Sequence, residues 1–368
     1  MKSIEAAVLR PEQSVMVFEH LQLEPPKANE VLVKIVACGI CHTDMVLRDA
    51  GLTPRPVVLG HEGSGIVESV GPGVSGFKPG DRVAISFASC GGCPACGKHA
   101  PSYCQQFLQL NFLGARGDGS TCLTNGDETI HSHIFGQSSF ATHAVCPVSN
   151  LVKVDDEIPL ELVGPFGCGF QTGAGAVLNS LKVSAGSTVM VLGAGAVGLS
   201  AVAAAVHIAQ AATVIALDLQ ESRLALAKEV GATHTLAGGL DSMTDAVRAL
   251  LPQGVDYIID TTGYAPLLEP SVALLANQGT LALVASYSPN ATLTLSPVGM
   301  MMAGKRIIGV MEGDSDIHTF IPALLEHFKK GRFPVDKLVR YYDFHDLNSA
   351  IDDAELGVTI KAIVTMPK

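Results

Sequence analysis

Four cysteines near position 100 have the residue type and the spacing of a metal site. They are Cys90, Cys93, Cys96 and Cys104. Four thiolates at these spacings suit tetrahedral coordination of Zn²⁺, and they leave no ligand position open to a substrate. The sequence therefore predicts a structural zinc that orders a loop with too little apolar surface to order itself. Disulfides or free thiols are the alternative, and neither explains this spacing in the reducing compartment that we expect.

A second set of metal-binding residue types is spread along the chain. Cys41, His61 and Cys168 each lie beside glycines or at the end of an expected strand, where loops collect functional side chains. A catalytic zinc takes three protein ligands and leaves one position to substrate, so these three residues are candidates for such a site. Alone, Cys168 is more typical of a small buried apolar residue. The cysteines without a partner pattern are interpreted as structural: Cys38, Cys122 and Cys146.

A glycine pattern in the second half of the chain indicates a dinucleotide site. Gly193, Gly195 and Gly198 follow an expected strand over 187–192 and open an expected helix over 196–210. In that context the glycines permit a tight turn, the approach of a pyrophosphate to the backbone, and close packing of helix on strand. The N-terminus of the helix faces the phosphates. A purely structural glycine turn is the alternative.

Asp218 strengthens the dinucleotide prediction, because it ends the next expected strand, over 213–218. A carboxylate at this point accepts the ribose hydroxyls and repels a 2′-phosphate, so the sequence favours NAD over NADP. Arg223 is a candidate neighbour of the same ribose, with a solvated helix residue as the alternative. An ordinary helix-capping role is the alternative for Asp218.

The elements that must position these residues fall into two parts. Strands expected over 31–37 and 65–70, and a turn at 79–83 that leads into another strand, predict a β-rich, partly barrelled first domain. Residues 86–135 have little periodicity and are expected to be a long loop. From about 170, expected strands at 187–192, 213–218, 255–260 and 279–284 alternate with helices, which predicts an α/β domain with a parallel, doubly wound sheet. A helix over 319–330 and a strand over 360–365 are expected to return to the first domain.

Composition excludes several classes of partner. The chain has 368 residues, a formal net charge of −11 and a hydrophobic fraction of 48%. This charge disfavours nucleic acid and anionic membranes and fits a small neutral substrate. The apolar run over 189–217 is interpreted as buried strands and a helix rather than a membrane span. No apolar core of signal-peptide length follows Met1, so we expect a cytoplasmic protein.

Four motifs, in order along nearly the whole chain, resemble those of the zinc-dependent medium-chain alcohol dehydrogenases. They are residues 39–44, residues 60–65, the four-cysteine segment and residues 167–173. Within that family, residues 136–141 and 171–176 are most similar to the bacterial aryl and allylic alcohol dehydrogenases, which act on benzyl alcohol or geraniol-like substrates. The resemblance implies a GroES-like catalytic domain over 1–169 and 310–368, with the structural zinc lobe at about 88–106. It also implies a Rossmann domain over 170–309 and a homodimer built across that cofactor domain.

The resemblance also implies roles for single residues. Cys41, His61 and Cys168 would bind the catalytic zinc, Glu62 would stand behind the metal, and Asp44 would hold the second ring nitrogen of His61. The remaining roles concern substrate and cofactor: Thr43 at the substrate oxygen, His42 at the pyrophosphate, and Thr172 and Val197 at the nicotinamide. Val46 stands where many relatives carry a proton-relaying histidine, which leaves the proton route open.

The expected reaction is the reversible oxidation of an aryl or allylic primary alcohol to the aldehyde, with hydride transfer to NAD. Dehydrogenation of aliphatic alcohols or of a formaldehyde–thiol adduct is the alternative. Polyol dehydrogenases commonly carry glutamate in place of Cys168, and zinc-free quinone reductases lack the ligands. A non-catalytic structural or redox-sensing protein predicts a lost ligand or a spoiled glycine loop, and both are intact here. The expected substrate-pocket residues are Ser86, Phe87, Phe107, Leu110, Phe112, Ile134, Phe135 and Met301.

Overall fold

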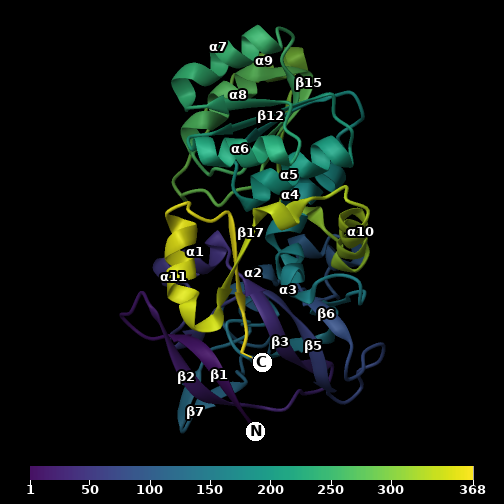
Figure 1. Ribbon diagram of the computed structural model, residues 1–368. Coiled ribbons are helices and arrows are strands. Elements are labelled where there is room, and N and C mark those ends of the chain that lie inside the picture. The colour runs from purple at the N-terminus through teal and green to yellow at the C-terminus, as the bar shows by residue number, and fades with distance from the viewer. Residues whose placement is uncertain (368) are drawn as a thin grey trace. The chain divides into compact units, whose positions relative to one another are not determined.

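The computed structural model describes residues 1–367, without the side chains of residues 241 and 242, and the chain forms two compact units. Unit 1 contains residues 1–168, 316–325 and 339–368, and unit 2 contains residues 169–315 and 326–338. Residues 310–315 and 326–338, which the sequence analysis places with the first domain, pack within unit 2. Figure 1 shows the elements of both units.

Unit 1 is built on two β-sheets. The antiparallel first sheet has the order β4 (Val57–Val58), β1 (Lys2–Leu9), β2 (Met16–Leu23), β7 (Leu123–Asn125) and β8 (Glu128–Ile130). The second has the order β10 (Leu151–Lys153), β6 (Arg82–Ile85), β5 (Glu62–Val70), β3 (Glu30–Gly39), β18 (Lys361–Thr365) and β17 (Val339–Asp343), and β9 (His143–Pro147) also pairs with β3. Four short helices lie wholly in this unit: α1 (His42–Ala50), α2 (Phe107–Phe112), α3 (Leu160–Val163) and α11 (Leu347–Glu355). The longer α10 (Ile317–Lys329) begins in unit 1 and ends in unit 2.

The register of the second sheet brings the ends of three strands together. β3 and β5 are antiparallel, and Gly39 at the end of β3 is the partner of Glu62 at the start of β5. β18 pairs with the same end of β3, where Ile363 is the partner of Gly39. Residues just after β3, just before β5 and at the start of β18 therefore meet at one edge of the sheet.

The expectation of a structureless loop over residues 86–135 is wrong in part. The segment contains α2, β7 and β8, and short 3₁₀ turns at Cys96–Lys98 and Pro101–Tyr103. The strands there are only three residues long, so they present too few alternating positions for a period of two to be recognised in the sequence. β7 pairs with β2, which is distant in the chain, and β8 pairs with β7.

Unit 2 has a six-stranded parallel sheet, which confirms the predicted Rossmann fold. Its order is β13 (His234–Ala237), β12 (Thr213–Asp218), β11 (Thr188–Leu192), β14 (Val255–Asp260), β15 (Leu275–Leu283) and β16 (Arg306–Gly309). The strand order reverses direction on either side of β11, so the crevice between the carboxyl ends of β11 and β14 is where such a sheet binds a ligand. Helices α5 (Ala196–His207) and α6 (Glu221–Glu229) lie on one face, and α7 (Leu240–Leu250) and α8 (Leu268–Leu274) on the other (Figure 1). The segment that leads into the sheet begins with α4 (Gly169–Gly175), and α9 (Pro297–Ala303) precedes β16.

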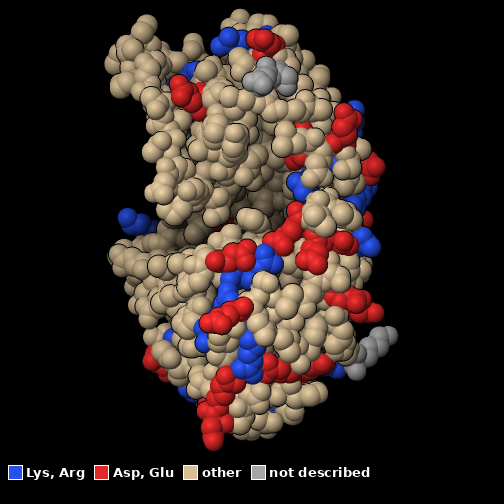
Figure 2. All heavy atoms as spheres, turned by 90° about the vertical axis from the view of Figure 1, so that its left-hand side faces the viewer, with Lys and Arg blue, Asp and Glu red and all other residues tan. Residues whose placement is uncertain are grey.

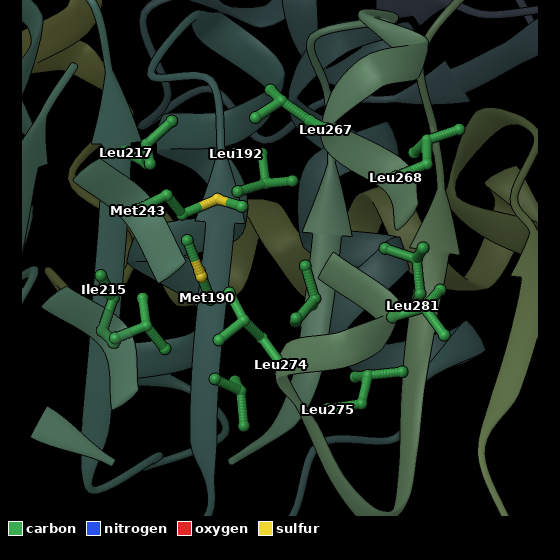
Figure 3. Packing of buried hydrophobic residues seen from close by; sticks show 14 residues of the cluster. Met190, Leu192, Ile215, Leu217, Met243, Leu267, Leu268, Leu274, Leu275 and Leu281 are labelled. Carbon is green, nitrogen blue, oxygen red and sulfur yellow. The ribbon is translucent and has the colours of Figure 1, made fainter. Parts of the chain in front are cut away.

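Both faces of this sheet are covered, which explains the apolar run noted in the sequence. Alternate residues of β11, Met190 and Leu192, point into the same cluster as Ile215 and Leu217 of β12 (Figure 3). Met243 of α7 closes that cluster. Full burial of each such side chain stabilises the fold by about 1.5–3 kcal/mol, so the sheet that carries the glycine loop has a rigid base.

The charges on one face of the protein are mixed in sign. Figure 2 shows Lys and Arg side chains interleaved with Asp and Glu on that face, with no broad positive region. This agrees with the formal net charge of −11 and gives no footing for a nucleic-acid backbone on that face. Across residues 1–367, no helix combines the length and the apolar character needed to cross a bilayer.

Candidate active site

Four side chains of types that can bind a metal come together at the edge of the second sheet of unit 1. Cys41 follows β3 and His61 precedes β5, so the pairing of Gly39 with Glu62 places them side by side. Cys168 follows a short 3₁₀ turn, Gly164–Gly167, whose glycines approach the backbone of Glu62 in β5 and of Ile85 in β6. One ligand atom from each of Cys41, His61, Glu62 and Cys168 lies within 4.8 Å of the others. The predicted ligands therefore converge.

The imidazole of His61 is held in the orientation that a metal ligand needs. Its Nδ1 is 2.9 Å from Asp44 Oδ1, and that carboxylate also accepts hydrogen bonds from the backbone N–H groups of Gly60 and Cys41. The opposite nitrogen, Nε2, is buried and has no hydrogen-bond partner among the described residues. Burial alone would lower the pKa of His61, but the charges of Asp44 and Cys41 raise it well above its usual value.

The thiols supply the rest of the donor set. A hydrogen bond with the Cys168 thiol is the main reason why the pKa of Cys41 lies well below its usual value; His61 and Lys361 add to this effect, and burial opposes it. Because the thiolate is the form that binds metal, two sulfurs and one orphaned imidazole nitrogen fit Zn²⁺. Thr43 Oγ1 lies 3.8 Å from Cys41 Sγ, whereas His42 is exposed at the start of α1 and lies outside this group.

Glu62 is paired with a lysine that the sequence analysis did not single out. Lys361 Nζ donates to Glu62 Oε1 at 2.9 Å and Oε2 at 2.8 Å, and to the carbonyl of Ile40 at 3.0 Å. The two side chains are 2% and 0% exposed, so this is a fully buried ion pair. Burial raises the pKa of Glu62, and the charge of Lys361 opposes that rise. The sequence offers one signal for this lysine: it is a charged residue at the start of a mostly apolar strand, β18.

Phenylalanine side chains form a wall beside His61. The ring of Phe135 stacks on the imidazole with centroids 4.4 Å apart and an interplanar angle of 25°. Phe112 and Phe107 contact Phe135 at centroid distances of 5.3 and 6.3 Å, and Phe87 contacts Phe107 at 5.8 Å. Of the expected pocket residues, these four phenylalanines are thus brought together, whereas Met301 lies in unit 2 with 74% of its surface exposed.

The four cysteines of the predicted structural site also converge. Their sulfur atoms lie within 4.8 Å of one another, and Cys93 Sγ is 3.5 Å from Cys96 Sγ. Backbone N–H groups point at the sulfurs: Gln106 donates to Cys104, and Gln105 donates to Cys93. Hydrogen bonds from the backbone of Cys96 and Gln105 lower the pKa of Cys93 to about 6. Burial raises the pKa of Cys104 to about 12, so the thiols differ in acidity, but four converging sulfurs fit a closed tetrahedral Zn²⁺ site.

The glycine loop of unit 2 has the geometry that its pattern predicts. Gly193 has φ +90°, and a Cβ there would lie 2.7 Å from Thr261 Oγ1. A Cβ on Gly198 would lie 1.9 Å from the carbonyl oxygen of Gly193, so only glycine lets the first turn of α5 approach the loop. No atom lies within 4 Å of a Cβ built on Gly195, which leaves the start of α5 open on that side.

Asp218, Arg223, Thr172 and Val197, which are also assigned to the dinucleotide, lie in unit 2 with that loop. Asp218 Oδ2 accepts a hydrogen bond from Ala194 N at 2.7 Å, so the carboxylate also braces the loop. Arg223 lies beside it, with NH1 3.8 Å from Asp218 Oδ2. A Cβ on Gly173 would lie 2.0 Å from the carbonyl of Val197, so α4 and α5 are in close contact where Thr172 and Val197 stand. The sequence analysis missed buried Glu312, whose Oε2 is 3.5 Å from Thr172 Oγ1.

Comparison with known proteins identifies the family. Residues 27–156 match the alcohol dehydrogenase GroES-like domain, and residues 196–329 match the zinc-binding dehydrogenase family. The chain is 42% identical to geraniol dehydrogenase of Castellaniella defragrans over 364 aligned residues. The alignment covers 98% of this chain and 97% of that protein. The chain belongs to the zinc-dependent medium-chain alcohol dehydrogenases.

Two solved structures of the same family agree over the full length. Benzyl alcohol dehydrogenase from Acinetobacter calcoaceticus is 41% identical, with a TM-score of 0.95 and full coverage of both chains. An alcohol dehydrogenase zinc-binding domain protein from Burkholderia ambifaria is 44% identical, with a TM-score of 0.97 and full coverage of both chains. This dehydrogenase therefore has the GroES-like and Rossmann domains that the motifs predicted.

The buried pair of Glu62 and Lys361 gives a stability prediction. Lys361→Met leaves the carboxylate buried without its cation, so we expect the free energy of unfolding to fall by about 3–5 kcal/mol. Urea unfolding of the purified enzyme measures this loss. The double variant Lys361→Met with Glu62→Gln removes both charges and should recover most of it. A double variant as unstable as the single one would contradict the pairing as the cause.

Proposed function

We propose that this dehydrogenase oxidises aryl or allylic primary alcohols to aldehydes and transfers the hydride to NAD. The observation that carries the proposal is the phenylalanine wall, in which Phe135 stacks on His61 and contacts Phe107 and Phe112. Aromatic faces favour flat, conjugated substrates over small aliphatic ones. The names of two relatives, geraniol dehydrogenase and benzyl alcohol dehydrogenase, support the same substrate class.

In the proposed site, Cys41, His61 and Cys168 hold the catalytic metal. When bound, Zn²⁺ at such a site polarises an alcohol hydroxyl and lowers its pKa toward neutrality. Asp44 keeps the proton on Nδ1 of His61, so that the lone pair of Nε2 faces the other two proposed metal ligands. Thr43 is the hydroxyl placed beside Cys41 to hydrogen-bond the substrate oxygen, and the phenylalanine wall excludes water from the reacting carbon. Lys361 holds the Glu62 carboxylate behind the ligands.

The reaction balances without a further reactant. The alcohol carbon gives a hydride to the oxidised nicotinamide, the hydroxyl proton is released, and the aldehyde and the reduced nicotinamide are formed. A benzylic or allylic carbon favours this step, because the adjacent π-system delocalises the partial positive charge that develops there. Val46 is a half-buried apolar residue and cannot carry a proton. We therefore propose that the hydroxyl proton of the alcohol leaves through the Thr43 hydroxyl.

We propose NAD as the coenzyme, with Gly193, Gly195 and Gly198 at the pyrophosphate and Asp218 at the adenosine ribose. Val197 and Thr172 are proposed to contact the nicotinamide, and His42 the pyrophosphate. Asp218 supports NAD because its charge repels a 2′-phosphate. The proximity of Arg223 to Asp218, at 3.8 Å, supports a place for that side chain at the same ribose. The proposal includes one catalytic and one structural zinc per chain.

A homodimer built through the cofactor domain is part of the proposal. Among the described strands, β16 stands at one end of the order of the parallel sheet, beside β15. α9, just before it, exposes Val298, Met301 and Met302 at 58%, 74% and 80%. An exposed apolar patch at the last strand of the sheet favours a second copy of the chain as its partner. Nine free cysteines fit a reducing, cytoplasmic location.

The substrate class is tested by comparing kcat/KM for benzyl alcohol, geraniol and ethanol with NAD, from absorbance at 340 nm. We expect an advantage of about 10³-fold for the two conjugated alcohols, which corresponds to about 4 kcal/mol of selective transition-state binding. Phe107→Ala should reduce that advantage, while Phe18→Leu, in a separate aromatic pair with Phe344, should leave it unchanged. Equal or better turnover of ethanol would favour the aliphatic alternative.

The coenzyme proposal is tested by Asp218→Asn. Removing the charge should raise kcat/KM with NADP relative to NAD by at least about tenfold, or about 1.4 kcal/mol. Steady-state kinetics with both coenzymes measure the ratio. Glu221→Gln, which removes a nearby negative charge at the start of α6, is the matched control and should leave the ratio unchanged. If the ratio of kcat/KM with NADP to that with NAD is unchanged in Asp218→Asn, the proposed place of Asp218 at the ribose is wrong.

The dimer proposal is tested by Met301→Asp with Met302→Asp. Two buried carboxylates at an apolar contact should convert a dimer into a monomer, as measured by size-exclusion chromatography with light scattering. Leu356→Asp, at a residue that is 73% exposed on unit 1, is the control and should stay dimeric. If the unsubstituted protein is a monomer, the dimer proposal is wrong.

A further inference from the structure

Gln137 uses its side-chain amide to hold the backbone directly after the His61 side chain, on both sides of Glu62. Its Nε2 donates to the carbonyl of His61 at 2.7 Å, and its Oε1 accepts from the N–H of Gly63 at 3.0 Å. Ser139 Oγ donates to the same Oε1 at 2.7 Å. Gln137 is 2% exposed, so water does not compete for these bonds. The amide acts as a fixed two-point clamp on the segment that carries His61.

The same amide connects His61 with the segment that carries Cys168. Gln137 Nε2 also lies 3.4 Å from the carbonyl of Ser86. The Ser86 hydroxyl in turn donates to the carbonyl of Gly167 at 2.6 Å, and Gly167 directly precedes Cys168. Ser86 is 0% exposed. A buried polar bridge thus runs from His61 through Gln137 and Ser86 to the residue before Cys168.

Asp44 connects His61 with only one of the two candidate cysteine ligands, and the bridge connects it with the other. Asp44 ties His61 to Cys41, because its carboxylate binds the imidazole and the backbone N–H of Cys41. The bridge through Gln137 and Ser86 joins His61 to Cys168 instead. Together the two networks fix the spacing of all three candidate ligands through the protein alone.

The segment around Gln137 is held in a strained conformation. His133, Phe135 and Ser138 have φ of +69°, +51° and +59°, a region that costs non-glycine residues roughly 1–2 kcal/mol each. Ser138 Oγ donates to the carbonyl of Val58 at 2.6 Å and helps to hold this shape. Strain of this kind persists where the surroundings over-determine it, and it concentrates at functional sites.

We infer that Gln137 and Ser86 are positioning residues that set the separation of His61 and Cys168 before the metal binds. The inference rests on the proposed role of Cys41, His61 and Cys168 as ligands. A site fixed in advance loses little conformational freedom when it takes up the metal, so loss of the bridge weakens binding at this site. Partners that orient metal ligands typically change metal affinity by about 10–100-fold when they are removed.

The test uses the enzyme loaded with two zinc ions and follows their release to a chromogenic chelator. The variants are Gln137→Met, which keeps the volume but removes the amide, and the milder Ser86→Ala. We expect one of the two ions to leave about 10–100-fold faster in either variant. The other ion, in the four-cysteine lobe, serves as an internal reference and should leave at the parent rate. The double variant should be close to the stronger single one, because both residues belong to one bridge.

Two further variants distinguish the possible failures. Asn348→Leu is the matched control: Asn348 clamps the backbone of Met16 through both amide atoms, at 3.0 and 2.9 Å, far along the chain from the ligands. If Gln137→Met and Ser86→Ala release zinc no faster than Asn348→Leu, the positioning role is overturned. If His61→Ala still retains both ions, the ligand assignment itself fails, and the inference falls with it. Loss of one ion from His61→Ala, with fast release from the bridge variants, supports both.

Discussion

Burial of several acidic groups around one point is the constraint on which unit 1 depends. Two thiols, Cys41 and Cys168, share a space within 4.8 Å with the Glu62 carboxylate and the His61 imidazole. Anionic groups removed from water are costly unless cations or hydrogen bonds compensate them. Lys361 supplies one cation from β18. A bound Zn²⁺ would supply the rest of the charge, so metal uptake and the stability of this sheet edge are coupled.

The same constraint explains the small residues around the site. A Cβ on Gly39 would lie 2.1 Å from Glu62 Oε2, and a Cβ on Gly63 would lie 2.2 Å from Ser139 Oγ. A Cβ on Gly164 would meet the carbonyl of Glu62 at 2.0 Å. Three chain segments therefore approach at distances that exclude any side chain. The close packing therefore requires glycine beside His61 in the sequence, and these glycines contribute no reacting group to the site.

Much of the fold could be predicted, and so could the residues that converge at the two candidate metal sites, because their signals are local. The strands β11, β12 and β14 are apolar runs with clear ends, and the glycine loop carries its own turn chemistry. Lys361 and Gln137 could not be found in this way. Each acts on a residue distant in the chain, and its meaning depends on the register of β18 with β3 or on the left-handed turn over 133–138. A single lysine or glutamine in a sequence has no pattern that reports such a partner.

In the proposed site, substrate recognition and metal positioning would share one segment of backbone. Phe135 stacks on His61 and contacts Phe107 and Phe112, while Gln137, two positions later, clamps the backbone of His61. Asn150 Nδ2 donates to the carbonyl of Phe135 and to that of Ser86, so the wall and the bridge are joined again. A change that widens the aromatic wall therefore also moves a support of the metal ligand. If both proposals hold, this linkage restricts how far the substrate preference can change by substitution in this segment without a loss of metal binding.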